Sequence, residues 1–95
     1  MAQVASDVSA RADSFLDYSF LEWEAVPDYV EEFETWDEIQ QLVFVHEWDI
    51  RESGLRVLRD FAEQGLLTRS QRERYDELLE LVARHRPAME RLRAD

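Results

Sequence analysis

The side chains that could bind a metal or carry acid–base chemistry are two histidines and 22 carboxylates, because the 95-residue chain has no cysteine. His46 and His85 lie 39 positions apart, and neither belongs to a Glu-x-x-His pair, the spacing found in di-metal helical bundles. The lack of cysteine also excludes disulfides, thiol catalysis and zinc–cysteine sites. We therefore expect no metal and no other cofactor, and we interpret His46 as a residue of the core or its boundary.

Pairs of carboxylates recur at helical spacing, as in Glu34 with Glu38 and Asp28 with Glu32. Acid–base catalysis needs two carboxyl groups whose pKa values are separated by their surroundings, usually in a cleft that excludes water. Nothing in the sequence indicates such a cleft, and a chain of this size buries only about 60–65% of its unfolded surface. The serines lack a nucleophile-elbow motif, and two glycines alone cannot form a phosphate-binding loop. We expect that the protein is not an enzyme.

The net charge of −11 is concentrated in the first half of the chain. Residues 1–50 contain thirteen acids and one base, whereas residues 51–95 contain nine acids and ten arginines. A strongly negative chain repels phosphate and gains nothing from counterion release, so we expect no direct binding to nucleic acid. Some of the acids of the first half have an obvious set of partners in the arginines of the second half.

Residues 28–38 combine six acids, three aromatic residues and no base. Aromatic side chains ringed by carboxylates would suit a basic protein partner, because the rings supply contact area and the charges steer the encounter. The alternative is that the rings point into the core while the acids face water. The partner-binding residues that this pattern predicts are Tyr29, Glu31, Glu32, Glu34, Trp36, Asp37 and Glu38.

The leading hypothesis is therefore a small, acidic, protein-interaction module that binds a basic protein partner. A second hypothesis is a nucleic-acid mimic that inhibits a DNA- or RNA-binding enzyme, as anti-restriction and anti-CRISPR proteins do. A third is a structural subunit that forms a homodimer through a stripe with a 3.5-residue repeat in the last helix. That stripe consists of Tyr75, Leu78, Val82, His85, Met89 and Leu92. Adaptation to high salt would also explain the acidity without any partner.

Helical periodicity runs through the whole chain and supplies the elements that position these residues. Pro27 is expected to end the first helix and to open a short one that carries Tyr29 and Phe33. Three later segments have the spacing of a helix start, beginning at Thr35, Asp49 and Thr68. Gly65 suits the position just after a helix end.

Apolar stripes indicate which faces of these helices pack inward. The helix from Thr35 is expected to bury Ile39, Leu42, Val43 and His46. The helix from Asp49 is expected to bury Ile50, Gly54, Val57, Leu58 and Phe61. The segment 40–48 is also rich enough in β-branched and aromatic residues to form a buried strand, although no partner strand is evident.

These patterns predict an all-α fold, a small antiparallel bundle of four to five helices. Residues 1–95 are expected to form a single helical domain, with 1–5 and 93–95 frayed. The long C-terminal helix is expected to be kinked or broken near Pro87, because proline lacks the N–H that an interior position needs. The longest run without a charge, 39–45, is too short to span a bilayer. We therefore expect a soluble, cytoplasmic protein with no membrane partner.

Overall fold

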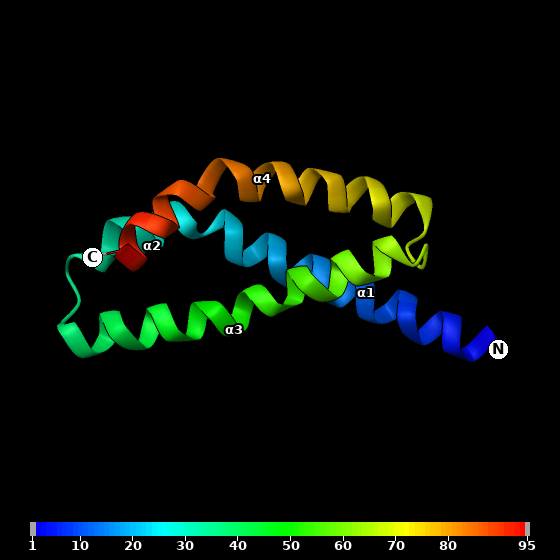
Figure 1. Cartoon of the computed structure of the whole chain (residues 1–95), viewed down its shortest axis with the longest axis horizontal. Helices are drawn as coiled ribbons and strands as arrows, with labels where there is room; N and C mark the ends of the chain where they lie inside the picture. Colours follow the sequence, from blue (N-terminus) through cyan, green and yellow to red (C-terminus); the bar gives the residue numbers. More distant parts are fainter. Residues whose placement is uncertain (1, 95) are drawn as a thin grey trace.

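The chain folds into four α-helices in the computed structural model, which describes the backbone of residues 2–94 and the side chains of 7–93 (Figure 1). The helices are α1 (Ala2–Glu24), α2 (Val26–Phe33), α3 (Glu38–Glu63) and α4 (Arg69–Ala94). No strand occurs within residues 2–94, so the all-helical prediction is confirmed and the strand considered for 40–48 is wrong. The expected fraying at 1–5 and 93–95 stays a prediction, and Met1 and Asp95 lie outside the described residues.

The break between α1 and α2 falls where the proline predicts it. Pro27 lies in the first turn of α2, where its missing N–H costs no helical hydrogen bond. The chain passes through Ala25 with nearly helical geometry, and the Tyr29 N–H donates to the Ala25 carbonyl at 3.1 Å. Val26 is fully buried at this junction. The short α2 is thereby held against the end of α1.

The start of α3 is capped by Asp37 rather than by Thr35, so the predicted boundary is two residues early. The Gln40 N–H donates to Asp37 Oδ1 at 2.8 Å, and the Asp37 N–H donates to Gln40 Oε1 at 3.2 Å, a reciprocal capping box. Thr35 instead donates its hydroxyl to the Glu32 carbonyl at 2.6 Å and closes the end of α2. Both overlapping sequences have capping spacing, but the Thr35 hydroxyl is used at the end of α2 and Asp37 caps α3.

The helix start predicted at Asp49 is wrong, because α3 runs unbroken from Glu38 to Glu63. Asp49 sits on an exposed face in its middle, where its carboxylate meets the Arg93 guanidinium at 2.7 Å. The helix ends as expected at Gly65, whose φ of 71° is the left-handed conformation favoured by glycine. The Leu66 N–H then donates back to the Phe61 carbonyl at 2.9 Å.

The start of α4 confirms the third predicted cap. The Gln71 N–H donates to Thr68 Oγ1 at 3.1 Å, and the Thr68 N–H donates to Gln71 Oε1 at 3.0 Å. The side-chain amide of the same glutamine donates to the Ser9 carbonyl at 3.0 Å and to Asp13 Oδ1 at 2.9 Å. One buried glutamine therefore both caps α4 and fixes it to α1.

The helices form an elongated bundle with extents of 50 × 22 × 18 Å. Figure 1 shows α3 running in the opposite direction to α1 and α4. Because α1 and α4 run the same way and contact each other, a fully antiparallel bundle is not confirmed. The α4 helix is continuous through Pro87, so the expected break is absent, and the expected kink stays a prediction.

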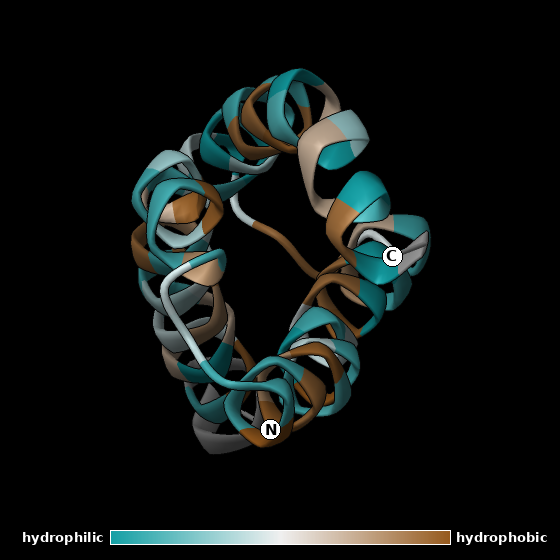
Figure 2. Ribbon diagram, turned by 90° about the vertical axis from the view of Figure 1, so that its left-hand side faces the viewer, coloured by the Kyte–Doolittle hydropathy of each residue, from teal (hydrophilic) through white to brown (hydrophobic). Residues whose placement is uncertain are grey.

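All four helices contribute to one hydrophobic core, and each carries hydrophobic and hydrophilic residues along its ribbon (Figure 2). Aromatic contacts join α1, α2 and α3, and α4 packs against all three of the other helices. The buried apolar side chains are Ala12, Leu16, Trp23, Val26, Phe33, Phe44, Trp48, Leu58, Tyr75, Leu78, Val82 and Met89.

The first half of α3 buries a different face from the one predicted. Phe44 and Trp48 lie in the core, whereas Ile39, Leu42 and Val43 are exposed. At about 100° per residue, these two sets lie on nearly opposite sides of the helix. The aromatic face turns inward because the rings of α2 and of Trp23 offer it more contact area than the smaller aliphatic side chains could use. Farther along α3 the predicted stripe holds in part: Gly54 and Leu58 are buried, but Ile50 is exposed.

The choice of face gives a direct test of stability. Phe44→Ala should lower the free energy of unfolding by about 3–5 kcal/mol, because it removes a buried ring from the core. Leu42→Ala, two positions away and 70% exposed, should change it by less than about 0.5 kcal/mol. Urea denaturation followed by circular dichroism measures both. Equal losses of stability in the two variants would contradict the burial of Phe44 and the exposure of Leu42.

Candidate interaction surface

The acids of residues 28–38 all lie on the surface of α2 and of the turn that leads into α3. They are Asp28, Glu31, Glu32, Glu34, Asp37 and Glu38, and every one of them is exposed. Among the side chains described for residues 7–93, none of these six carboxylates takes part in an ion pair. The segment therefore presents six uncompensated negative charges to solvent.

The aromatic residues of the same segment turn inward instead. The Tyr29 ring lies 5.2 Å from that of Phe44, and the Trp36 ring lies 5.2 Å from the same phenylalanine. Phe33 packs between them, 5.9 Å from Trp36 and 6.1 Å from Phe44. Of the predicted partner-binding residues, the five acids thus remain at the surface, while Tyr29 and Trp36 are half-buried in the core. This arrangement matches the alternative in which the rings serve the core.

The turn between α2 and α3 is held by hydrogen bonds to its backbone. The Gln41 side-chain amide donates to the Phe33 carbonyl at 2.8 Å and to the Trp36 carbonyl at 3.3 Å. The Asp37 cap fixes the other side of the turn. These hydrogen bonds fix the backbone of the turn that joins the two parts of the acidic segment.

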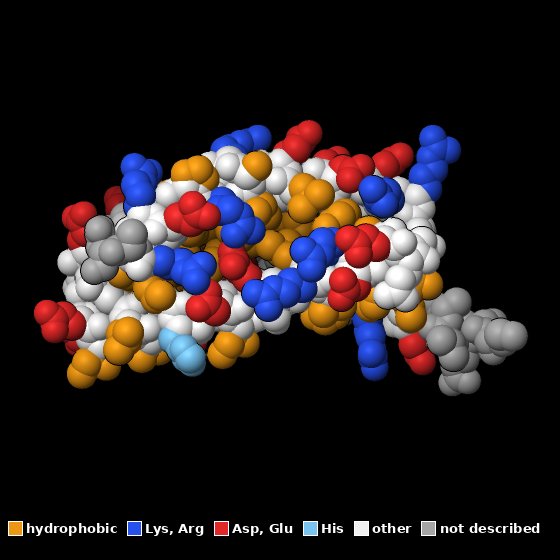
Figure 3. Space-filling model, viewed as in Figure 1, with side chains coloured by type: hydrophobic (Ala, Val, Ile, Leu, Met, Phe, Trp, Pro, Cys, Tyr) orange, Lys and Arg blue, Asp and Glu red, His pale blue; other side chains and the backbone are white. Residues whose placement is uncertain are grey.

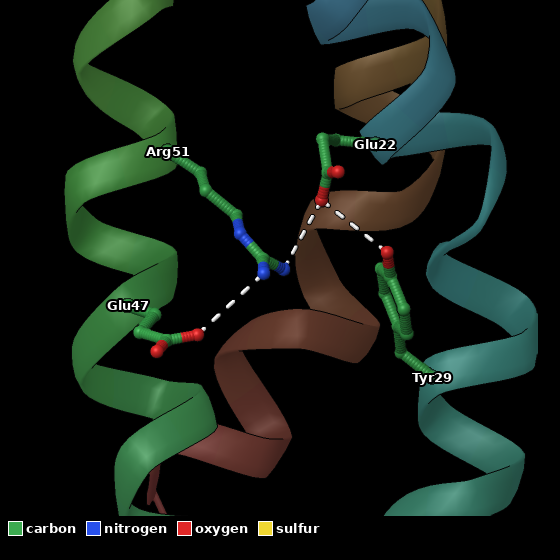
Figure 4. A network of polar contacts seen from close by, with 4 residues as sticks. All are labelled: Glu22, Tyr29, Glu47 and Arg51. Atoms are coloured by element: carbon green, nitrogen blue, oxygen red, sulfur yellow. Dashed lines mark hydrogen bonds and ion pairs between the residues drawn. The ribbon is translucent and has the colours of Figure 1, made fainter.

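A polar network ties the three N-terminal helices together next to this segment (Figure 4). The Arg51 guanidinium lies 3.2 Å from the Glu22 carboxylate and 3.5 Å from that of Glu47. The Tyr29 hydroxyl donates to the same oxygen of Glu22 at 3.3 Å. Arg51 of α3 thereby neutralises Glu22 of α1, whose side chain is mostly buried. The Tyr29 hydroxyl links the same carboxylate to α2.

Other arginines of the second half neutralise acids outside residues 28–38. Arg74 meets Asp17 at 2.8 Å, and Arg86 meets Glu52 at 3.1 Å while its guanidinium lies 5.4 Å from the centre of the Trp23 ring. The Asp49–Arg93 pair belongs to the same group. The face between α3 and α4 consequently shows mixed positive and negative side chains (Figure 3).

An apolar strip lies exposed on the outer face of α3, where the sequence pattern predicts buried residues. Ile39 is 73% exposed, Leu42 70%, Val43 48% and Ile50 63%. Hydrophobic side chains gather along the edge of the molecule over α3 in Figure 3. The signal was present in the sequence, since residues 39–50 are apolar on both faces of a helix and only one face packs inward.

The stripe considered for a homodimer lies in the core of the chain. Tyr75, Leu78, Val82 and Met89 are buried, and His85 and Leu92 are half-buried. They pack against the other helices, so a dimer contact through them would require α4 to separate from the bundle. The homodimer through this stripe stays a prediction.

Neither histidine sits in a cluster of metal-binding side chains. His46 is exposed on α3, which corrects its expected place on the buried stripe, and His85 is half-buried on α4. Among the described residues, no group of three or more His, Cys, Asp or Glu side chains is arranged to hold a metal ion. The described helices also include none with the length and apolar character that crossing a membrane requires.

The packing of Tyr29 generates a prediction at alkaline pH. Burial, and then the nearby Glu22 carboxylate, raise the pKa of Tyr29 above its ordinary value of 10.0, and burial likewise raises the pKa of Tyr75. Because the folded state holds these protons more tightly, the stability they contribute is complete below pH 10 and is lost as pH rises through the raised pKa values. The chain has no lysine or cysteine to titrate in that range.

We expect the free energy of unfolding to fall above pH 10, and to fall less steeply in Tyr29→Phe. Urea denaturation between pH 8 and pH 11 measures the two slopes. The single variants Tyr29→Phe and Tyr75→Phe should each remove part of the alkaline loss. An unchanged slope in Tyr29→Phe would contradict the role given to burial of this phenol.

Comparisons with protein-family models, with curated proteins and with solved structures found no match to this chain.

Proposed function

We propose that the protein is a small interaction module that binds a basic protein partner through the acidic surface of residues 28–38, and that it does not act as a catalyst. The observation that supports this most directly is the run of six exposed carboxylates, unpaired among the described side chains and with no basic residue among them. Interhelical ion pairs use Asp17, Glu22, Asp49 and Glu52, but none of the six carboxylates of 28–38. Self-repulsion among unpaired acids costs stability, and a basic partner would relieve it.

The ordered backbone of this surface supports the same proposal. Gln41 and the Asp37 capping box hold the turn, so little conformational entropy would be lost when a partner binds. Uncompensated charges at an exposed surface mainly accelerate encounter and select partners of opposite charge. Binding should therefore be fast at low ionic strength and weaken as salt is added.

Neutralising the acidic surface should abolish the interaction. The variant carries Glu31→Gln, Glu32→Gln, Glu34→Gln, Asp37→Asn and Glu38→Gln, and asparagine at 37 keeps an N-cap oxygen. In pull-downs from a cell lysate at low salt, with the captured proteins identified by mass spectrometry, wild type should retain a basic protein. The variant should lose it, because the complementary charges are gone.

A matched control separates surface location from total charge. It neutralises five exposed acids of the second half, none of which is in an ion pair among the described side chains, and so changes the net charge by the same five units. These acids are Asp60, Glu63, Glu77, Glu80 and Glu90. The control should bind like wild type. Equal retention of the basic protein by the folded 28–38 variant and by wild type would refute the proposal.

The nucleic-acid mimic remains the alternative proposal, since exposed carboxylates could also occupy the phosphate-binding groove of an enzyme. No arrangement on this surface favours it over a basic protein partner. If the captured protein is a nuclease or another DNA-binding enzyme, competition with duplex DNA distinguishes the two. Displacement of DNA would then assign the same surface to mimicry.

We also propose that Pro87 bends α4. Proline removes a helical hydrogen bond and its ring crowds the preceding turn. A bend there would direct the last turn of α4 toward α3, where Arg93 meets Asp49. This ion pair joins the C-terminal end of α4 to the middle of α3.

A further inference from the structure

The apolar strip of α3 lies next to the acidic surface and has no partner within the described part of the chain. Its apolar residues are Ile39, Leu42, Val43 and Ile50, which follow one side of the helix over about three turns, with the exposed His46 among them. Exposed apolar patches on proteins commonly mark sites of protein–protein interaction. The core of this chain already uses the opposite face of the same helix.

Two shallow grooves flank the strip, so its side chains protrude between them. On one side Trp36, Ile39, Val43 and Phe44 line an open groove with few polar atoms. On the other side, Leu42 and Val45 line a groove that reaches Leu92 of α4. Protruding aliphatic side chains between two hollows form a surface onto which the ridge of another helix can pack.

The strip is bordered by carboxylates. Glu38 and Asp49 follow one edge at helical spacing, Glu47 follows the other, and Glu34 and Asp37 lie at its N-terminal end. Two of these acids already meet an arginine, Asp49 with Arg93 and Glu47 with Arg51, which leaves the border with a net negative charge. A partner that covers the strip therefore needs apolar side chains in its centre and basic ones at its margins.

We infer that the apolar strip of α3 docks the hydrophobic face of a basic amphipathic helix from another protein. This inference rests on the proposed function and names the element that the basic partner supplies. Leucine-sized side chains on the partner at i, i+3, i+4 and i+7 cover the strip, and Lys or Arg beside them meet the bordering carboxylates. The strip provides affinity and the acidic surface of 28–38 provides steering.

A second copy of this chain is a poor occupant of the strip. Each copy carries a net charge of −11, and α3 would bring its own bordering acids against the same acids of its partner. Like charges placed across an interface oppose association. The charge pattern therefore favours a basic helix over self-association.

The test uses an 18-residue Leu/Lys peptide with helical amphipathic spacing, and a second peptide of the same composition with the leucines spread around the helix. Binding is measured by fluorescence anisotropy at several salt concentrations. Wild type should bind the amphipathic peptide at least ten-fold more tightly than the scrambled one. Leu42→Gln/Val43→Gln should remove that ten-fold preference and leave the weaker electrostatic binding of both peptides.

Three controls keep the outcomes separate. Leu79→Gln changes an exposed leucine of α4 outside the strip and should bind both peptides like wild type. Circular dichroism should show that Leu42→Gln/Val43→Gln keeps the helical fold, since both residues are exposed. The 28–38 charge variant should bind both peptides more weakly and with a reduced salt dependence, but should keep the preference for the amphipathic one.

The two proposals fail differently. If Leu42→Gln/Val43→Gln keeps the full preference, the strip is not the docking site, although the acidic surface can still bind a basic partner. If the charge variant binds both peptides like wild type, the proposed function itself is overturned. A concentration-dependent dimer in light scattering that Leu42→Gln/Val43→Gln abolishes would overturn the inference in favour of a second copy.

Discussion

The aromatic cluster between α2 and α3 is the contact on which the rest of this structure depends. Phe44 stands at its centre, with the rings of Tyr29 and Trp36 both 5.2 Å away, and Trp48 links it to Trp23 of α1. Two of these contacts are edge-to-face and two are tilted, and such contacts add to the large area that aromatic residues bury. Because the cluster takes the aromatic face of α3, it fixes the rotation of that helix and leaves the aliphatic face outside.

The same cluster explains why the aromatic rings of residues 28–38 point inward and the carboxylates point outward. Once the rings are committed to the core, the carboxylates between them must face water, since burying an unpaired charge costs far more than exposing it. The arginines of the second half lie along α3 and α4 and reach Asp17, Glu22, Asp49 and Glu52 instead. Six carboxylates, unpaired among the described side chains and with no basic residue among them, therefore lie within residues 28–38, beside the exposed apolar strip.

The binding surface that emerges has a different composition from the one that the sequence pattern suggests. Tyr29 and Trp36 were candidates for its apolar anchors, and both are half-buried. Ile39, Leu42 and Val43 were candidates for the core, and all three are exposed. The acids occupy the surface in either case. The acidic part of this surface is therefore easier to predict than the apolar part. An unpaired charged residue must face water, whereas an apolar residue can lie either in the core or in an exposed binding surface.

Local sequence alone was enough to predict the helical class, the junction at Pro27, the stop at Gly65 and the capping box at Thr68, since each depends on backbone chemistry within a few residues. It was not enough to place the start of α3, where two overlapping caps compete, or to exclude a helix start at Asp49. Nor was it enough to orient residues 39–50, which carry apolar side chains on two opposite faces of the helix. Tertiary packing decided that orientation, because the face with the larger rings gains more contact with the aromatic residues of α1 and α2 than the aliphatic face would.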